Sequence, residues 1–369
     1  MKKTLFLLLF ILTMFSCSQK GPTYGTLTGT IKNIKNDTIL YLIDNERDSV
    51  VQKFLVKNGH FKIKFSAPVP KLFVIRPENY KYEKDFLDLW LDNSPTKLYG
   101  NMYNMADSKI EGSAPNGIYD IYKSIEYNYQ HDSTKINIQK HISDQKVQDS
   151  LAIVLKNLQI DYKNNLMKFY SENISSEVAF YYIFFEIARY KSALDRNDIK
   201  YLYDLLPEKF KNSKDGAEIK NYISLPDVPK NGERYLDFSQ STPEGKLEAI
   251  SSNLGKYTIL EFWASSCGSC RIEHPSLRKL YQEYHKKGLN IIGISGDNRL
   301  SDWVEAIDKD SIPWLNISDL GGFYNRGFML YGVKFIPRLI LLDKDGIIID
   351  DNFGYSFFNE DALKKIFKN

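Results

Sequence analysis

Cysteine is scarce in this chain of 369 residues, which contains only Cys17, Cys267 and Cys270. So few thiols exclude a framework of structural disulfides. The sequence also lacks a second CxxC motif and a histidine pair that could complete a zinc site with Cys267 and Cys270. We therefore expect no bound metal, and no motif indicates another cofactor.

An excess of charge of either sign is also lacking. The 49 basic and 46 acidic residues give a formal net charge of only +3, and the lysines are scattered along the chain. There is no basic block and no arginine-rich stripe, so nothing recommends nucleic acid as a partner. The length suggests two or three domains.

The apolar run at the N-terminus, residues 5–15, is too short to span a bilayer comfortably. Lys2 and Lys3 precede this run, and Ser16 and Cys17 follow it. A charged part, an apolar part and a small-residue part in this order are typical of a secretory signal. The sequence therefore predicts an exported protein.

Ser16 and Cys17 resemble the end of a bacterial lipoprotein lipobox, although Met14 and Phe15 depart from its commonest form. The resemblance implies a mature chain that begins at a lipidated Cys17 and is anchored to a membrane of the cell envelope, facing the periplasm. A plain secreted protein cut nearby is the alternative. We expect a signal peptide at residues 1–16 and a tether at 17–24.

Short β-rich runs separated by turn residues follow, between residues 25 and 112. Alternation is clearest at residues 60–65, where Phe61, Ile63 and Phe65 share one face. We predict a small antiparallel β-domain, a sandwich. It has no cysteine and no His/Asp/Glu cluster at ligand spacing, so we interpret it as a scaffold or partner-binding module.

Helical spacing replaces the β pattern at residues 113–220. The segment 143–170 has apolar residues at helical spacing, and 176–190 is apolar nearly all round, which predicts a buried helix. We expect a helical domain whose aromatic residues pack in its core. Residues 221–234 contain two prolines and a glycine and are predicted to form a linker.

The C-terminal part, residues 235–369, has a strong α/β pattern. Residues 257–263 are predicted to form a buried strand, followed by a tight turn and a helix that opens on Cys267-Gly268-Ser269-Cys270. A thiol at the start of a helix meets the positive end of the helix dipole, so this arrangement predicts a redox site. Strand, helix, strand, hairpin and a terminal helix at 359–367 follow the order of thioredoxin.

These residues resemble the thioredoxin-like disulfide oxidoreductases, most of all the exported, membrane-tethered TlpA/ResA-like branch. The resemblance rests on several motifs in the right order: EFWASSCGSC, Pro275, the Ile336-Pro337 pair and LLDKDG. It implies a thioredoxin-like C-terminal domain behind a β-domain and a helical region, as in Bacteroidetes-type lipoproteins. It implies no cofactor beyond the two cysteines.

On this resemblance, Cys267 is the nucleophile at the exposed start of the helix. Cys270 is one turn further on, more buried, and resolves the mixed disulfide. Glu261, on the same strand face as Ile259 and Trp263, is the expected acceptor of the proton of Cys270, because desolvation raises the proton affinity of a buried carboxyl group.

Glu273 is a second catalytic candidate, since ResA-like proteins have a glutamate three residues after the second cysteine. The alternative for Glu273 is a solvated helix residue. His274 follows it, and we predict that His274 lies on the surface.

Pro337 matches the cis-proline of the family, which leaves the backbone of Ile336 open to pair with a substrate strand. Trp263 and Ser266 are further candidate substrate contacts. Ser266 replaces the usual tryptophan before the first cysteine, and Ser269 replaces the usual proline before the second. Both departures bear on partner choice and on the reduction potential, so the sequence leaves open whether the site reduces or oxidises its partners.

The leading hypothesis is a membrane-anchored periplasmic thiol–disulfide oxidoreductase that reduces disulfides of exported proteins and receives electrons from a DsbD-type membrane donor. A peroxiredoxin-like thiol peroxidase is less consistent with the sequence, because Leu260 and Ala264 stand where its motif needs Pro and Thr/Ser. A non-catalytic binding or scaffold lipoprotein is the third hypothesis.

Overall fold

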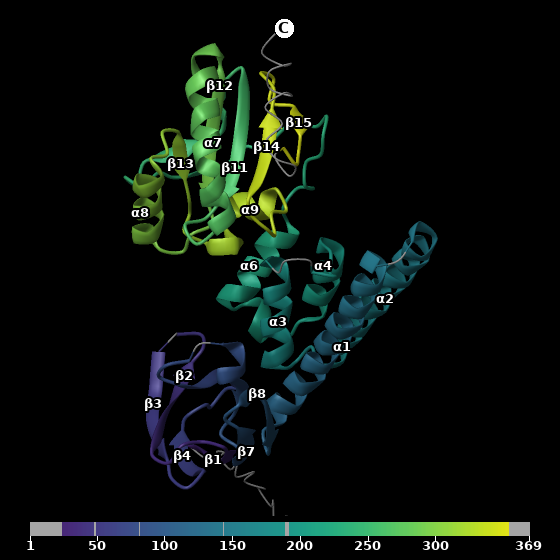
Figure 1. The fold of residues 1–369 in the computed structure, drawn as a ribbon, viewed down its shortest axis with the longest axis vertical. Helices are drawn as coiled ribbons and strands as arrows, with labels where there is room; N and C mark the ends of the chain where they lie inside the picture. The colour runs from purple at the N-terminus through teal and green to yellow at the C-terminus, as the bar shows by residue number, and fades with distance from the viewer. Residues whose placement is uncertain (1–23, 48, 81, 143, 189–191, 354–369) are drawn as a thin grey trace, which may run out of the picture. The chain divides into compact units, whose positions relative to one another are not determined.

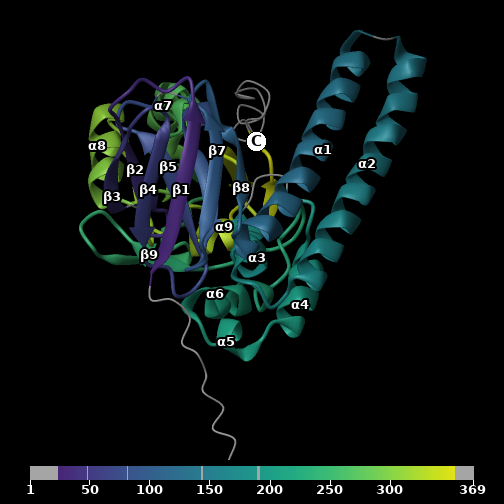
Figure 2. The ribbon, with the colours of Figure 1, turned by 90° about the horizontal axis from the view of Figure 1, so that it is seen from below.

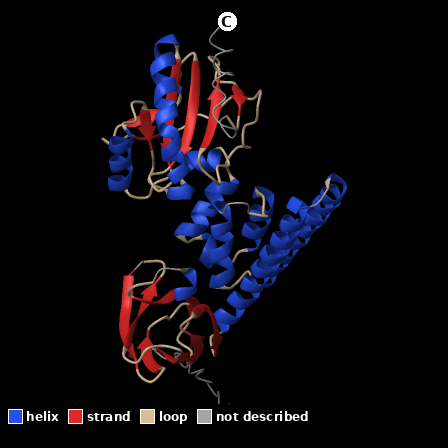
Figure 3. Cartoon of the chain, in the orientation of Figure 1, coloured by secondary structure: helices blue, strands red, loops and turns tan. Residues whose placement is uncertain are grey.

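The computed structural model describes residues 24–47, 49–80, 82–142, 144–188 and 192–353 (Figure 1). The predicted signal peptide, Cys17 and the terminal helix at 359–367 lie outside the described residues. The chain divides into two compact units, Met1–Asp132 with Ser176–Val178, and Ser133–Ser175 with Ala179–Asn369. Figure 3 shows strands in the N-terminal and C-terminal parts and mostly helices in the residues between them.

The first unit contains two four-stranded sheets, ordered β4-β1-β7-β8 and β3-β2-β5-β6. Figure 2 shows β1 next to β4 and β7. The strands are β1 (Gly25–Lys32), β2 (Thr38–Asp44), β3 (Ser49–Val56), β4 (His60–Phe65), β5 (Lys71–Pro77), β6 (Leu87–Leu91), β7 (Thr96–Asn101) and β8 (Asn104–Glu111). Both sheets contribute to one apolar core, as a sandwich requires.

The alternation predicted for β4 is confirmed, because Phe61, Ile63 and Phe65 are all buried. Gly29 of β1 lies opposite Phe61, and a Cβ at this glycine would collide with the phenyl ring. All described strand pairs of this unit are antiparallel except β1–β7, which is parallel. The prediction of an antiparallel β-domain did not include this parallel pair, whose strands are far apart in the sequence.

Six helices follow: α1 (Ala114–Ile142), α2 (Gln145–Glu172), α3 (Glu177–Ala188), α4 (Arg196–Leu205), α5 (Glu208–Lys211) and α6 (Lys214–Ile223). The predicted apolar stripe of α2 is buried only toward its end, at Tyr162 and Leu166, whereas Val147 and Val154 are exposed. Pro207 follows α4 and is the N-cap residue of α5, and α6 ends at Ile223, close to the predicted end of the helical domain at residue 220. Among the described residues, no helix is long and apolar enough to span a bilayer.

The C-terminal region has a five-stranded sheet in the order β13-β12-β11-β14-β15. Strand β11 (Tyr257–Trp263) lies at its centre, parallel to β12 (Leu289–Ser295) and antiparallel to β14 (Arg338–Leu342). The outer strands are β13 (Leu315–Ile317) and β15 (Ile348–Asp350), and a small hairpin pairs β9 (Ser239–Ser241) with β10 (Leu247–Ala249). The bounds of β11 match the prediction.

Both faces of this sheet are covered. Ile259 and Trp263 pack with α7 (Gly268–Tyr284) and α8 (Leu300–Asp310) on one face. Leu260 and Phe262 pack with α9 (Arg326–Leu330) on the other. This alternation is the period of a central strand buried on both sides. The C-terminal end of this central strand lies just before the CxxC motif.

Candidate active site

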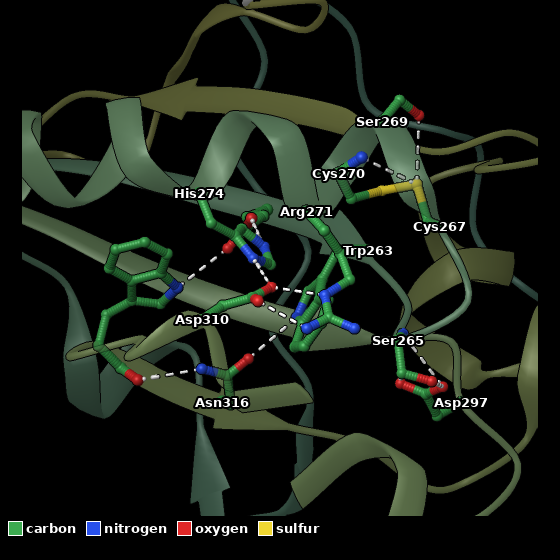
Figure 4. Close-up of polar contacts among 12 residues, drawn as sticks. Trp263, Ser265, Cys267, Ser269, Cys270, Arg271, His274, Asp297, Asp310 and Asn316 are labelled. Atoms are coloured by element: carbon green, nitrogen blue, oxygen red, sulfur yellow. Dashed lines mark hydrogen bonds and ion pairs between the residues drawn. A yellow bond between two sulfur atoms is a disulfide. The ribbon is translucent and has the colours of Figure 1, made fainter. Parts of the chain in front are cut away.

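The two cysteines lie where β11 gives way to α7. Cys267 is the N-cap residue of α7 and is half-buried, whereas Cys270 is only 1 % exposed. Their sulfur atoms form a disulfide across a Cα–Cα distance of 5.3 Å (Figure 4). Only one of the two thiols is therefore accessible to a large partner once the pair is reduced.

Hydrogen-bond donors surround the sulfur of Cys267. The backbone N–H of Cys270 donates to Sγ at 3.1 Å, and Oγ of Ser269 lies 3.4 Å from the same atom. The N-terminus of a 17-residue helix adds the positive end of its dipole. After reduction these groups favour the thiolate of Cys267, which is the reactive form.

The loop before Cys267 is held by a buried aspartate that the sequence analysis did not identify. The carboxylate of Asp297, which is 6 % exposed, accepts hydrogen bonds from the backbone N–H and the hydroxyl of Ser265. It also accepts one from the hydroxyl of Ser295 at 2.7 Å. These contacts join the end of β12 to the segment that carries Ser266 and Cys267.

Pro337 follows a cis peptide bond with Ile336, as the family resemblance implied. Both residues are half-buried and line a hollow of about 330 Å³ beside Ser269 and Glu273. The structure thus brings the CxxC helix and the Ile336–Pro337 loop together around one concave surface. Ser266 is exposed nearby in sequence, just before Cys267.

Trp263 does not fit the role that we assigned to it. Its side chain is fully buried, and its Nε1–H donates to Oδ1 of Asn316 at 2.9 Å. A substrate in the hollow cannot touch a side chain enclosed in the core, so the expected substrate contact is wrong. Trp263 supports the site by packing its ring against His274, with centroids 4.9 Å apart.

Glu261 lies in the core, as its strand face predicted, with 2 % of its surface exposed. Its Oε2 accepts a hydrogen bond from Nε1 of Trp314 at 2.9 Å. Its Oε1 lies 3.1 Å from Nε2 of His274. Both carboxylate oxygens therefore have polar partners, which offsets the cost of burying this group.

His274 is not a surface residue, and that prediction is wrong. Its side chain is completely buried. It lies on the same face of α7 as Cys270, which is one turn earlier in the helix. Its Nδ1 lies 2.7 Å from Oδ2 of Asp310, opposite the contact with Glu261 (Figure 4). His274 is hydrophilic but can be buried, because the carboxylates of Glu261 and Asp310 contact its ring on two sides.

Arg271 completes this cluster by binding Asp310 through Nε and Nη2, at 2.7 and 2.6 Å. The hydrogen bond from Arg271 holds the pKa of Asp310 below its ordinary value, and His274 contributes in the same direction although burial opposes both. Burial alone lowers the pKa of His274, but Glu261 and Asp310 outweigh it and raise the pKa. The cluster thus favours a charged imidazolium between two carboxylates.

Glu273, the second carboxyl candidate, is half-buried and borders the hollow. Burial raises its pKa, and the nearby charge of Glu261 raises it further, while His274 acts in the opposite direction. Two carboxyl groups near the cysteines thus differ in setting: Glu261 is enclosed and paired with His274, and Glu273 faces the concave surface.

Sequence reasoning missed His274, Asp310 and Trp314 as parts of the site. A signal for His274 was present, because residues 270, 274, 277 and 284 recur at helical spacing and all of them are buried. Asp310 and Trp314 lie about 40 residues further along the chain, at the end of α8 and just after it. No local pattern indicates that they return to Glu261.

Two family models match separate parts of the chain. Residues 230–361 match the family model described as Redoxin. Residues 26–119 match a domain of unknown function, DUF4369.

Curated relatives match the C-terminal part. The Thiol-disulfide oxidoreductase ResA of Bacillus cereus is 29 % identical over 149 residues, which cover 40 % of this chain and 84 % of the relative. Its namesake from Halalkalibacterium halodurans is 25 % identical over 134 residues, covering 36 % and 74 %.

A solved thiol-disulfide oxidoreductase from Bacteroides fragilis is 27 % identical, with a TM-score of 0.34, covering 36 % of this chain and 99 % of that one. The C-terminal region of this chain therefore contains a thioredoxin-like Redoxin domain, and its homologues are ResA/TlpA-like thiol–disulfide oxidoreductases.

Proposed function

We propose that this protein is a lipid-anchored periplasmic thiol–disulfide oxidoreductase that reduces disulfides of exported proteins. The observation that carries the proposal is the Cys267–Cys270 disulfide at the start of α7, beside the concave surface of Ile336 and Pro337. The relatives are themselves named thiol-disulfide oxidoreductases. A partner protein of extended shape fits such a surface through its backbone.

The reaction transfers two electrons from the dithiol to the partner. The thiolate of Cys267 attacks one sulfur of the partner disulfide, and the other partner sulfur leaves as a thiolate and takes up a proton. Cys270 then attacks Cys267, forms the intramolecular disulfide and releases the second partner thiol. The chain ends oxidised, so a membrane donor of the DsbD type is the proposed source of electrons for the next cycle.

Insulin reduction tests the activity. The full chain in detergent should accelerate the reduction of insulin by dithiothreitol at least about tenfold, because the site favours the reactive thiolate. The variant with both cysteines changed to serine should match dithiothreitol alone. If the Cys267/Cys270 couple has a reduction potential of about −120 mV rather than about −270 mV, the protein is an oxidant instead. Consumption of peroxide without insulin reduction would assign a peroxidase.

The membrane anchor is a separate proposal that rests on residues 2–17. Cells expressing the natural chain should retain it in the membrane fraction, because the acyl chains on Cys17 anchor it firmly. Cys17→Ala should move most of the protein to the soluble fraction. Equal membrane retention of both forms would contradict lipidation at Cys17.

A further inference from the structure

His274 has an unusual position for an ionisable residue. It lies one turn after the resolving Cys270, its side chain is completely enclosed, and its ring packs edge-on against Trp263. Burying a polar ring costs free energy unless polar partners surround it. The polar partners of His274 are the carboxylates of Glu261 and Asp310.

Three elements supply charges to this ring. Glu261 comes from β11, Asp310 from the end of α8 and Glu273 from α7 itself, and Arg271 of α7 binds Asp310. Glu305 and Asp297 act on Arg271 from further away. Among the described residues, no group of three or more His, Cys, Asp and Glu side chains is arranged to hold a metal ion.

The two nitrogen atoms of His274 have different contacts. Nδ1 lies 2.7 Å from Asp310, which Arg271 holds in place. Nε2 faces Oε1 of Glu261 at 3.1 Å, as an ion pair rather than an aligned hydrogen bond. With the imidazole charged, the four groups Glu261, His274, Asp310 and Arg271 sum to zero charge, which suits a buried cluster.

We propose that His274 is a positioning residue for the resolving step: it neutralises and orients the Glu261 carboxylate that takes the proton of Cys270. This inference deepens the proposed function and rests on it. Asp310, held by Arg271, keeps the ring of His274 in this orientation.

The thiol proton of Cys270 passes to the carboxylate of Glu261, and the resulting thiolate attacks the sulfur of Cys267 in the mixed disulfide. The bond between Cys267 and the partner sulfur breaks as the Cys267–Cys270 bond forms. The partner leaves as a thiolate and takes up one proton, and Glu261 returns its proton to solvent. No additional oxidant or reductant is needed.

Replacing His274 by an apolar ring removes both the charge and the polar contact that face Oε1 of Glu261. His274→Phe should therefore slow resolution at pH 7 by about tenfold or more. The pH profile of its second phase should differ from that of the natural chain, because the variant lacks the imidazole whose pKa Glu261 and Asp310 raise. Asp310→Asn should change the pH profile by a smaller amount.

The reaction of the reduced full chain with 5,5′-dithiobis(2-nitrobenzoate) separates the two steps. The first equivalent of thionitrobenzoate reports attack by Cys267, and the second reports resolution by Cys270. The first phase should be unchanged in His274→Phe and Asp310→Asn, which also shows that both variants are folded. His285→Gln, at an exposed histidine just after the same helix, is the matched control and should leave both phases unchanged.

The inference is overturned if the second phase of both His274→Phe and Asp310→Asn keeps the natural rate and pH profile. A natural chain that forms its disulfide with the reagent but does not reduce insulin would contradict the proposed function instead. The two failures are therefore distinguishable.

Discussion

Cys270→Ser will convert the protein from a turnover catalyst into a trap that stays covalently attached to its partner. Cys267 remains at the start of α7 and still attacks a disulfide, because its environment does not depend on the thiol of Cys270. Release of the partner then needs an external thiol. Loss of an intramolecular attacking group should slow release by more than about 1,000-fold.

Mass spectrometry under non-reducing conditions measures this effect directly. The reduced variant, mixed with insulin and then quenched with acid, should carry an insulin chain on Cys267. The natural chain should show only its internal disulfide. Cys267→Ser is the matched control and should form little adduct, because Cys270 is only 1 % exposed. Equal adducts on the two single variants would show that the attacking and resolving roles are not divided in this way.

Glu261→Leu will destabilise the oxidised fold, by about 3 kcal/mol, as expected when one partner of a buried ion pair is removed. The replacement leaves Nε2 of His274 and the Nε1–H of Trp314 facing an apolar group inside the core. Denaturant unfolding at pH 6 measures the loss. Glu305→Gln is the control, since Glu305 and its partner Lys309 are both largely exposed, and it should cost less than about 0.5 kcal/mol.

The pH dependence of this loss identifies the charge state of His274. Burial lowers the pKa of His274, but Glu261 and Asp310 outweigh it, so the folded chain has a pKa above the ordinary value of about 6.5. The stability gained from this charge is complete below about pH 6.5 and is lost as the pH rises through the raised value. The deficit of Glu261→Leu should therefore be larger at pH 6 than at pH 9. A deficit that does not change with pH would indicate an uncharged imidazole.

Local patterns in the sequence predicted most of the elements. Alternation at Phe61, Ile63 and Phe65 identified β4 and its buried face. A short apolar run identified β11, because a central strand is enclosed on both faces. The predicted helical domain at 113–220 includes α5 and most of α6, but their separate bounds were not predicted, since a proline that ends one helix can also begin the next.

The candidate site was only partly predictable, for a related reason. The CxxC pair, Glu261 and Pro337 belong to short segments whose residue types indicate their chemistry. Trp263 was misjudged because a tryptophan near a redox pair can either face a partner or fill the core, and only the packing against His274 and Asn316 decides between them.

The sequence alone determined the redox pair and the buried carboxylate of the strand before it, because the spacing along one strand and one helix turn sets both. Only the tertiary structure decided what faces that carboxylate. Asp310 and Trp314 reach the site through α8 and the segment after it, and their contacts turn His274 from an expected surface residue into the centre of a buried charge cluster. Charges far apart in sequence compensate one another only when folding brings them together, and a local sequence pattern does not show which distant residues come into contact.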